Sequence, residues 1–181
     1  MKIISGKLRG RVIDSYNIEG TRPTMDRVKE SVFASIQNYL NGCVFLDLFS
    51  GTGNIGIEAI SNGASLCYFV DNNKICVNII TDYIKKFDIV DNSVVLNKDY
   101  KSALEYFYSN NIKFDIVYLD PPYKTNYIND IINIIVNNNI LNDKGLIIVE
   151  NSNNNEINRF NLDVIKEKKY GNKYITILKK E

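Results

Sequence analysis

The sequence of 181 residues contains no histidine and only three cysteines. Without histidine, Ser-His-Asp and Cys-His nucleophilic catalysis and the commonest zinc sites are excluded. Cys43, Cys67 and Cys76 form no C-x-x-C pair and no ligand cluster, so we interpret them as small buried hydrophobes in a reducing compartment. We therefore expect no metal, and a chemistry that depends on carboxylates, backbone groups and a reactive cofactor.

Long apolar runs are also missing. The longest apolar clusters, such as IVYL and LIIV, have the length of a strand and fall far short of a membrane span. The first residues contain no apolar run long enough for a signal peptide. We therefore expect a cytoplasmic protein without a membrane partner, long enough to bury a sizeable core.

The net charge of +1 hides an uneven distribution. Residues 1–29 and residues 159–181 each carry seven Lys/Arg against three Asp/Glu, whereas residues 30–158 carry eight against fifteen. Basic ends around an acidic centre predict a polyanion-binding rim around a site that does not itself bind phosphate. For the C-terminal cluster, scattered solvated lysines are an equally good interpretation.

The first 41 residues predict an appendage made of a hairpin and a helix. A short hairpin with a turn at Gly6-Lys7 opens the chain, and apolar residues recur at helical spacing from Met25 to Leu40, where Gly42 ends the pattern.

Residues 42–181 predict the catalytic domain. Apolar strand patterns alternate with helical patterns, and a tight turn at Gly171-Asn172 joins two final strands. The predicted fold is α/β and Rossmann-like: a seven-stranded, mostly parallel sheet with an antiparallel C-terminal hairpin and helices on both faces. The expected strands before this hairpin cover residues 43–49, 66–71, 93–97, 114–120 and 145–150, and the expected helices cover residues 54–61, 73–87, 100–110 and 127–136.

A glycine-rich turn follows the first of these strands. Gly51, Gly53 and Gly56 lie between a strand and a helix, which lets a ligand approach the backbone closely. Asp47 ends the strand before the turn and would attract an ammonium group but repel a pyrophosphate. Asp71 ends the next strand, where a ribose is usually held. A ligand with a ribose and a cationic amine but no phosphate is S-adenosylmethionine.

Three further residues complete the predicted cofactor site. Asp99, just past the third strand, is placed to accept a hydrogen bond from the adenine amine, and it can equally cap the helix that follows. Phe49 adjoins the glycine turn, and Asn72 follows Asp71. Both are included in the same predicted site.

The motif Asp120-Pro-Pro-Tyr123 indicates the reaction. It follows the fourth strand, at the edge where open parallel sheets bind their ligands. The Asp120 carboxylate and the Pro121 carbonyl are two acceptors that suit the two N–H donors of an aromatic amine. Tyr123 offers a flat surface on which a base can stack. Asp120, Pro121 and Tyr123 are therefore the expected catalytic residues.

At this point a family resemblance can be stated. The segments DLFSGTGNIGIEAISNGA and FDIVYLDPPY resemble class I amino-methyltransferases. The segments SGKLRGR and TRPTMDRVKESVF are similar to the RsmD-type bacterial methyltransferases, which modify guanine N2 in 16S ribosomal RNA. The resemblance covers nearly the whole chain, although position 50 is Ser where Ala is common and the last third matches only in outline. It implies an enzyme that acts on 16S ribosomal RNA or a small-subunit assembly particle, and we expect a monomer.

Other functions are weighed against this interpretation. An adenine-N6 methyltransferase acting on DNA or RNA would use the same groups, and the motif alone leaves it open. A C5-pyrimidine methyltransferase would need a cysteine nucleophile near a strand-end motif. A nicotinamide dehydrogenase leaves the Asp-Pro-Pro-Tyr motif unexplained, and a non-catalytic RNA-binding module leaves the strand-end acids unexplained.

Four arginines of the first 41 residues are the predicted RNA contacts: Arg9, Arg11, Arg22 and Arg27. Strand alternation would project Arg9 and Arg11 from one face of the hairpin. Arg27 falls in the first turn of the predicted helix, where a cation is disfavoured unless it has an anionic partner. RNA phosphate is the preferred partner, and Asp26 or Glu30 is the alternative.

Overall fold

The structure, a computed structural model, describes residues 1–14, 26–122, 127–151 and 157–181. Within these ranges one sheet of seven strands runs in the order β3-β2-β1-β4-β5-β7-β6. β1 to β5 are parallel to one another, and β7 pairs antiparallel with both β5 and β6. The strands are β1 Val44–Asp47, β2 Leu66–Asp71, β3 Ser93–Asn97, β4 Phe114–Leu119, β5 Leu141–Asn151, β6 Asp163–Tyr170 and β7 Lys173–Lys179.

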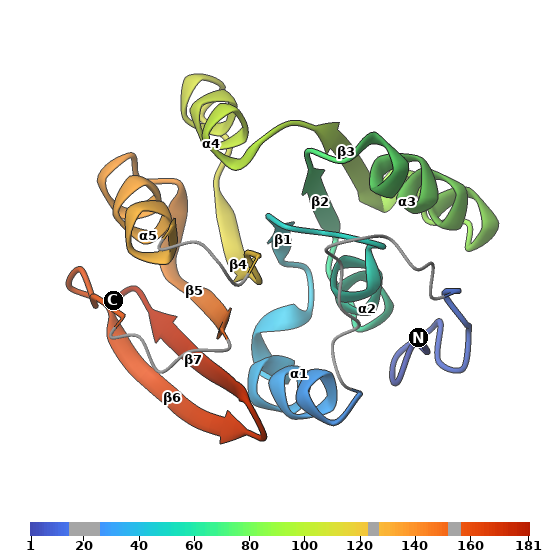
Figure 1. The fold of residues 1–181 in the computed structure, drawn as a ribbon, viewed down its shortest axis with the longest axis horizontal. Helices are drawn as coiled ribbons and strands as arrows, with labels where there is room; N and C mark the ends of the chain where they lie inside the picture. The colour runs from blue at the N-terminus through green and yellow to red at the C-terminus, as the bar shows by residue number, and fades with distance from the viewer. Residues whose placement is uncertain (15–25, 123–126, 152–156) are drawn as a thin grey trace.

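Helices cover both faces of this sheet (Figure 1). α1, α2 and α3 lie on one face, and α4 and α5 lie on the other. The helices are α1 Asp26–Leu40, α2 Asn54–Ser61, α3 Lys74–Lys86, α4 Tyr100–Ser109 and α5 Tyr127–Asn137, with a short 3-10 helix at Val90–Asn92. The predicted Rossmann-like fold with its final hairpin is confirmed, including the turn between β6 and β7 at Gly171-Asn172.

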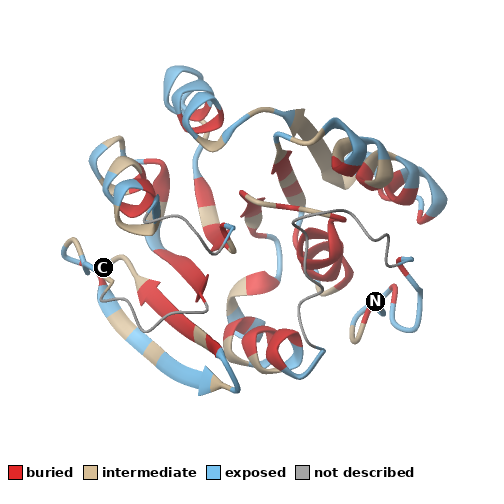
Figure 2. Cartoon of the chain, viewed as in Figure 1, coloured by how far each residue is buried: buried red, intermediate tan, exposed pale blue. Residues whose placement is uncertain are grey.

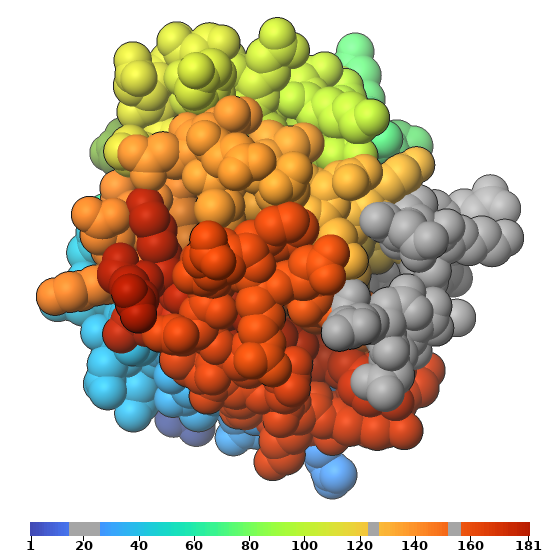
Figure 3. All heavy atoms as spheres, turned by 90° about the vertical axis from the view of Figure 1, so that its left-hand side faces the viewer, coloured from blue at the N-terminus to red at the C-terminus, as the bar shows by residue number. Residues whose placement is uncertain are grey.

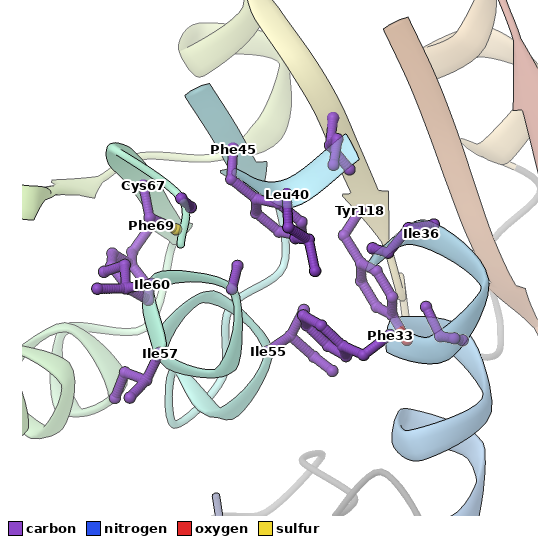
Figure 4. Close-up of a cluster of buried hydrophobic side chains, with 14 of the residues drawn as sticks. Phe33, Ile36, Leu40, Phe45, Ile55, Ile57, Ile60, Cys67, Phe69 and Tyr118 are labelled. Atoms are coloured by element: carbon purple, nitrogen blue, oxygen red, sulfur yellow. The ribbon is translucent and has the colours of Figure 1, made fainter. Parts of the chain in front are cut away.

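Two apolar cores lie on the two faces of the sheet, because the parallel strands are buried on both sides (Figure 2). In the core under α1 and α2, Tyr118 of β4 points toward Phe33 and Ile36 of α1 (Figure 4). The three cysteines are free and buried, as expected. Among the described residues, no helix is long and apolar enough to cross a membrane.

The predicted N-terminal β-hairpin forms, with shorter strands than expected. Residues 1–3 run antiparallel to residues 11–13, but the only bridge that forms there among the described residues is Lys2↔Val12. The chain between them docks on α2, where the N–H of Lys7 donates to the Ser61 carbonyl at 2.8 Å. A Cβ on Gly6 would lie 1.9 Å from that carbonyl oxygen, so a side chain at this position would break the contact. Packing against α2 therefore replaces a regular strand ladder.

β5 begins earlier than predicted. Its first residue, Leu141, pairs with Phe114, and the pairing shifts register before Leu146 pairs with Ile116. The intervening Asn142, Asp143 and Lys144 resemble a turn in sequence, which hid this irregular part of the strand.

Candidate functional site

Three carboxylates lie together at one edge of the sheet, where the parallel strands end. Asp47 is the last residue of β1, Asp71 is the last residue of β2, and Asp120 follows β4. The charges of Asp71 and Asp120 both act on the Asp47 carboxyl. Open parallel sheets bind their ligands at this edge, so the three acids define the candidate site.

The loop between β1 and α2 leaves room at this edge. Gly51 and Gly53 have positive φ angles of 54° and 80°. A Cβ built on Gly51 would meet no described atom within 4 Å, so the loop faces open space at that point. In contrast, a Cβ on Gly56 would lie 2.2 Å from Cε1 of Phe69. The third glycine therefore allows close packing of α2 on β2.

Asp47 is buried beneath this loop. Its carboxyl is 2% exposed and accepts the N–H of Gly56 at 3.1 Å through Oδ2. Burial raises the pKa of Asp47 to about 8, although the Gly56 N–H opposes this change. Such a carboxyl is mostly protonated at pH 7 and becomes ionised when a cation approaches it. This environment suits the predicted ammonium partner.

Asp71 connects the glycine loop with the start of α3. Its Oδ2 accepts the N–H of Gly51 and its Oδ1 accepts the N–H of Asn73, both at 2.8 Å. Burial raises the pKa of Asp71, and the two N–H groups oppose this effect. Each carboxylate oxygen can accept a further hydrogen bond, which keeps the predicted ribose contact feasible.

Asp99 caps α4. Its Oδ1 accepts the N–H groups of Lys101 and Ser102 at 3.0 and 3.1 Å, and its Oδ2 accepts the Ser102 hydroxyl at 2.6 Å. The Ser102 hydroxyl is the main cause of a lowered Asp99 pKa. The helix-capping role is thus confirmed, while the contact with an adenine amine stays a prediction.

Aromatic rings border the same edge. The ring of Phe49, just after β1, lies 6.0 Å from that of Tyr100, and Tyr100 lies 5.3 Å from Tyr127 at the start of α5. Asn72, next to Asp71, is exposed. The predicted roles of Phe49 and Asn72 toward the cofactor stay predictions.

The second predicted motif begins at Asp120. This carboxyl is half-buried, and burial raises its pKa to about 6 while the Lys173 ammonium opposes that rise. Pro121 is buried and Pro122 is exposed. Tyr123 lies outside the described residues.

Among the described arginines of the predicted RNA-binding set, Arg9 and Arg11 lie apart from Arg27. Arg9 and Arg11 belong to the segment docked at the last residue of α2, and the Arg11 guanidinium lies 5.3 Å from the ring centre of Phe87, which follows α3. Since α2 and α3 both start at the site edge, their far ends lie at the opposite edge of the sheet. Arg9 occupies a turn, not a strand, so the prediction that strand alternation projects it beside Arg11 is wrong.

Arg27 lies nearer to the candidate site. It is exposed in the first turn of α1, two residues before Lys29. The Lys29 ammonium donates to Oδ1 of Asn54, the first residue of α2, which places this end of α1 at the site edge. Arg22 lies outside the described residues.

Sequence reasoning missed a buried ion pair between α1 and α2. The Lys29 ammonium lies 2.9 Å from Oε2 of Glu58, and both side chains are almost fully buried. Glu58 also accepts the N–H groups of Ile4 and Ser5. The pair therefore holds the N-terminal segment, α1 and α2 together. No periodicity distinguishes these two residues from surface charges on an amphipathic helix.

A second buried ion pair was also missed, between Lys173 of β7 and Glu150 of β5. Glu150 lies at the end of an apolar strand segment, as Asp47 and Asp71 do. This shared position could have indicated from the sequence that Glu150 lies near the candidate site. Lys173 was counted within the basic C-terminal cluster, but it is only 4% exposed.

The other lysines of that cluster are partly engaged. Lys166 donates to the hydroxyl of Ser35 in α1 at 2.5 Å, and Lys180 pairs with Asp143 at 3.0 Å. Lys168 and Lys169 are exposed on β6, the edge strand at the centre of the face in Figure 3. In the described part of the chain, no group of acids and cysteines is arranged to hold a metal ion.

The sheet order, the final hairpin and the glycine loop with its strand-end acids define a Rossmann-like class I methyltransferase. The family described as conserved hypothetical protein 95 matches residues 1–179. YlbH of Bacillus subtilis is 33% identical over 99% of both chains. Ribosomal RNA small subunit methyltransferase D of Haemophilus influenzae is 34% identical over 94% of this chain and 89% of its own length. The chain belongs to this RsmD-type methyltransferase family, which confirms the resemblance seen in the sequence.

Solved structures agree with the fold. HI0767 of Haemophilus influenzae superimposes with a TM-score of 0.80 at 29% identity, covering 98% of this chain and 97% of that one. An RNA methyltransferase from Salinibacter ruber, in complex with S-adenosyl-L-homocysteine, gives a TM-score of 0.66 over 87% of this chain and 93% of that one. Its identity of 14% supports the likeness in fold alone.

Proposed function

We propose that this enzyme transfers a methyl group from S-adenosylmethionine to the N2 amine of a guanine in 16S ribosomal RNA. The observation that carries the proposal is the half-buried Asp120, followed by two prolines, at the same sheet edge as the glycine loop. Membership in the family of ribosomal RNA small subunit methyltransferase D supports the RNA substrate. We propose a cytoplasmic monomer that acts on the RNA or on a small-subunit assembly particle.

The residues present fit the cofactor. Gly51 borders open space. Burial disfavours the charged form of the Asp47 carboxyl, and a bound cation would stabilise that form. Asn54, at the start of α2, has a buried amide nitrogen without a hydrogen-bond partner among the described residues. Asp47 would hold the ammonium group, Asp71 the ribose and Asp99 the adenine amine.

When bound, S-adenosylmethionine supplies a methyl carbon that its positive sulfur has already activated. The task of the protein is therefore placement and charge stabilisation. The Asp120 carboxylate and the Pro121 carbonyl would accept the two N–H groups of the amine and keep its lone pair directed at the methyl carbon. Asp120 would stabilise the positive charge on the methylated nitrogen, which then loses a proton. Tyr123 would stack on the base.

Single-turnover methylation of 16S ribosomal RNA by the D120A variant tests this proposal. We expect the rate to fall by about a hundredfold or more, with RNA affinity less affected. The D143A variant is the matched control, because Asp143 is an exposed acid on the irregular part of β5. Near-normal turnover of D120A would contradict the proposed role.

Mass analysis of the nucleosides from the methylated RNA tests the base. N2-methylguanosine is the expected product, and N6-methyladenosine would overturn the guanine assignment while leaving the site intact. A separate variant, D71A, should weaken S-adenosylmethionine binding by about 1.5–3 kcal/mol in calorimetry, as expected for a charged hydrogen bond. Unchanged affinity would remove Asp71 from the cofactor site.

A further inference from the structure

A chain of buried polar side chains crosses three strands beside the candidate site. The Tyr118 hydroxyl of β4 donates to Oε2 of Glu150 in β5, and the Lys173 ammonium of β7 pairs with Oε1 of the same carboxylate. Their exposed fractions are 1%, 0% and 4%. Burial of this many polar atoms in one cluster is costly, so its location calls for an explanation.

Strand register places this cluster next to Asp120. Tyr118 pairs with Ile148, and Glu150 pairs with Ile175. Because side chains alternate along a strand, positions 118 and 120, 148 and 150, and 173 and 175 all face the α1 side of the sheet. Asp120 follows Tyr118 by two residues and so continues the row that Glu150 and Lys173 occupy.

The charges near Asp120 come from several elements. Asp47 of β1 and Lys173 of β7 interact with it through their charges, and Glu150 of β5 is the partner of Lys173. On the helices above this face, Lys29 of α1 is paired with Glu58 of α2.

In the described part of the chain, two tyrosines are the remaining titratable neighbours of the cluster. Tyr118 is bound to Glu150, and Tyr170 of β6 pairs in register with Lys173. Among the described residues, Lys173 is therefore the cation placed to act on Asp120. Its ammonium opposes the rise that burial causes in the pKa of that carboxyl.

We infer that Lys173 and Glu150 form a positioning pair that keeps Asp120 ionised while leaving its oxygens free for the substrate amine. This inference rests on the proposed role of Asp120. A lone lysine beside Asp120 would bind the carboxylate directly and compete with the amine for its lone pairs. Glu150 draws the ammonium toward β5, and Tyr118 fixes the orientation of Glu150. Lys173 then acts on Asp120 through its charge.

The pH dependence of single-turnover methylation at saturating S-adenosylmethionine tests this pair. We expect K173M to move the acidic limb of the profile up by about one to three pH units, as when an opposite charge is removed from a carboxyl. Activity should return at higher pH, because the carboxylate can still form there. E150Q should move the limb down, since Lys173 would then act on Asp120 without a competing anion. K173R keeps the charge and should retain the wild-type limb.

Opposite displacements by K173M and E150Q would not arise from a purely structural role. The inference is overturned if both variants keep the wild-type profile, or if both limbs move the same way. Thermal melting and cofactor calorimetry identify variants that have lost their fold. If K173M does not fold, the pH profiles of E150Q and K173R test the inference. An active D120A variant would instead refute the proposed function, so the two failures are distinguishable.

Discussion

Two buried Lys–Glu pairs lie on the same side of the sheet, and their surroundings differ. Glu58 of the Lys29 pair also receives backbone N–H groups of Ile4 and Ser5 and the Ser5 hydroxyl. Lys29 in addition donates to the Lys2 carbonyl at 2.7 Å. Nearly every donor and acceptor there serves to join three segments of the chain.

The pair between Lys173 and Glu150 connects two neighbouring strands that a backbone ladder already holds. Its special neighbour is the half-buried Asp120. The same two residue types therefore serve as a clamp in one region and, in the proposed mechanism, as a source of charge for a reactive carboxyl in the other.

The largest expected effect comes from breaking the clamp. K29M leaves the Glu58 carboxylate buried without its cation, so we expect the free energy of unfolding to fall by about 3–5 kcal/mol. Urea denaturation followed by circular dichroism measures this loss. K2M, at an exposed lysine whose carbonyl and not its side chain binds Lys29, is the control and should stay within about 0.5 kcal/mol of wild type. A loss below about 1 kcal/mol for K29M would contradict the stabilising role of the Lys29–Glu58 pair.

A smaller effect is expected at Asp47, a buried acid on which the charges of Asp71 and Asp120 act. Burial raises its pKa to about 8, and an unfolded Asp titrates near 4. The folded state thus holds the proton more tightly, and the unliganded protein should lose stability as pH rises between these values.

The D47N variant removes this titration. We expect it to exceed the wild type in stability at pH 9 by about 1–3 kcal/mol and to bind S-adenosylmethionine more weakly. Thermal melts at pH 5 and pH 9 provide the measurement. If the wild type were instead the more stable protein at pH 9, the carboxyl would have to be ionised and already satisfied in the free enzyme.

The smallest expected effect concerns RNA binding. Arg27 lies at the site edge, whereas Arg9 and Arg11 lie near the opposite edge of the sheet. R27A should lower the log–log salt slope of RNA binding by about 0.7, the value for one phosphate contact on a single strand. R9A/R11A should lower it by less. Measurement of ribosomal RNA binding across a salt series checks both expectations. A larger effect of the double variant would indicate that RNA binds on the N-terminal segment and not beside Arg27.

The sheet and the glycine loop were predictable because both depend on local sequence. Continuous apolar strands, helical spacing and turn residues fix the order of the elements, and Gly51, Gly53 and Gly56 lie where such loops require glycine. Asp99 was assigned two compatible roles, and the structure confirms the capping role that depends on neighbours in sequence.

The parts that depend on distant contacts were not predictable. Residues 1–14 pair with one another through one antiparallel bridge and also dock on the end of α2, a contact that no local pattern in the sequence indicates. Lys29 and Lys173 have the sequence surroundings of solvated lysines, and only tertiary packing buries them. The roles of Tyr123 and Arg22, which lie outside the described residues, stay predictions.

The burial of the three cysteines also makes their thiols natural probes of local opening of the structure. Cys43 precedes β1, Cys67 lies within β2 and Cys76 lies in α3, all at most 4% exposed. Burial raises the pKa of the Cys43 and Cys76 thiols to about 12 and about 11, so in the closed state they offer almost no thiolate to an alkylating reagent. Their labelling rates therefore report how often the strand and helix around each thiol separate, without any engineered reporter.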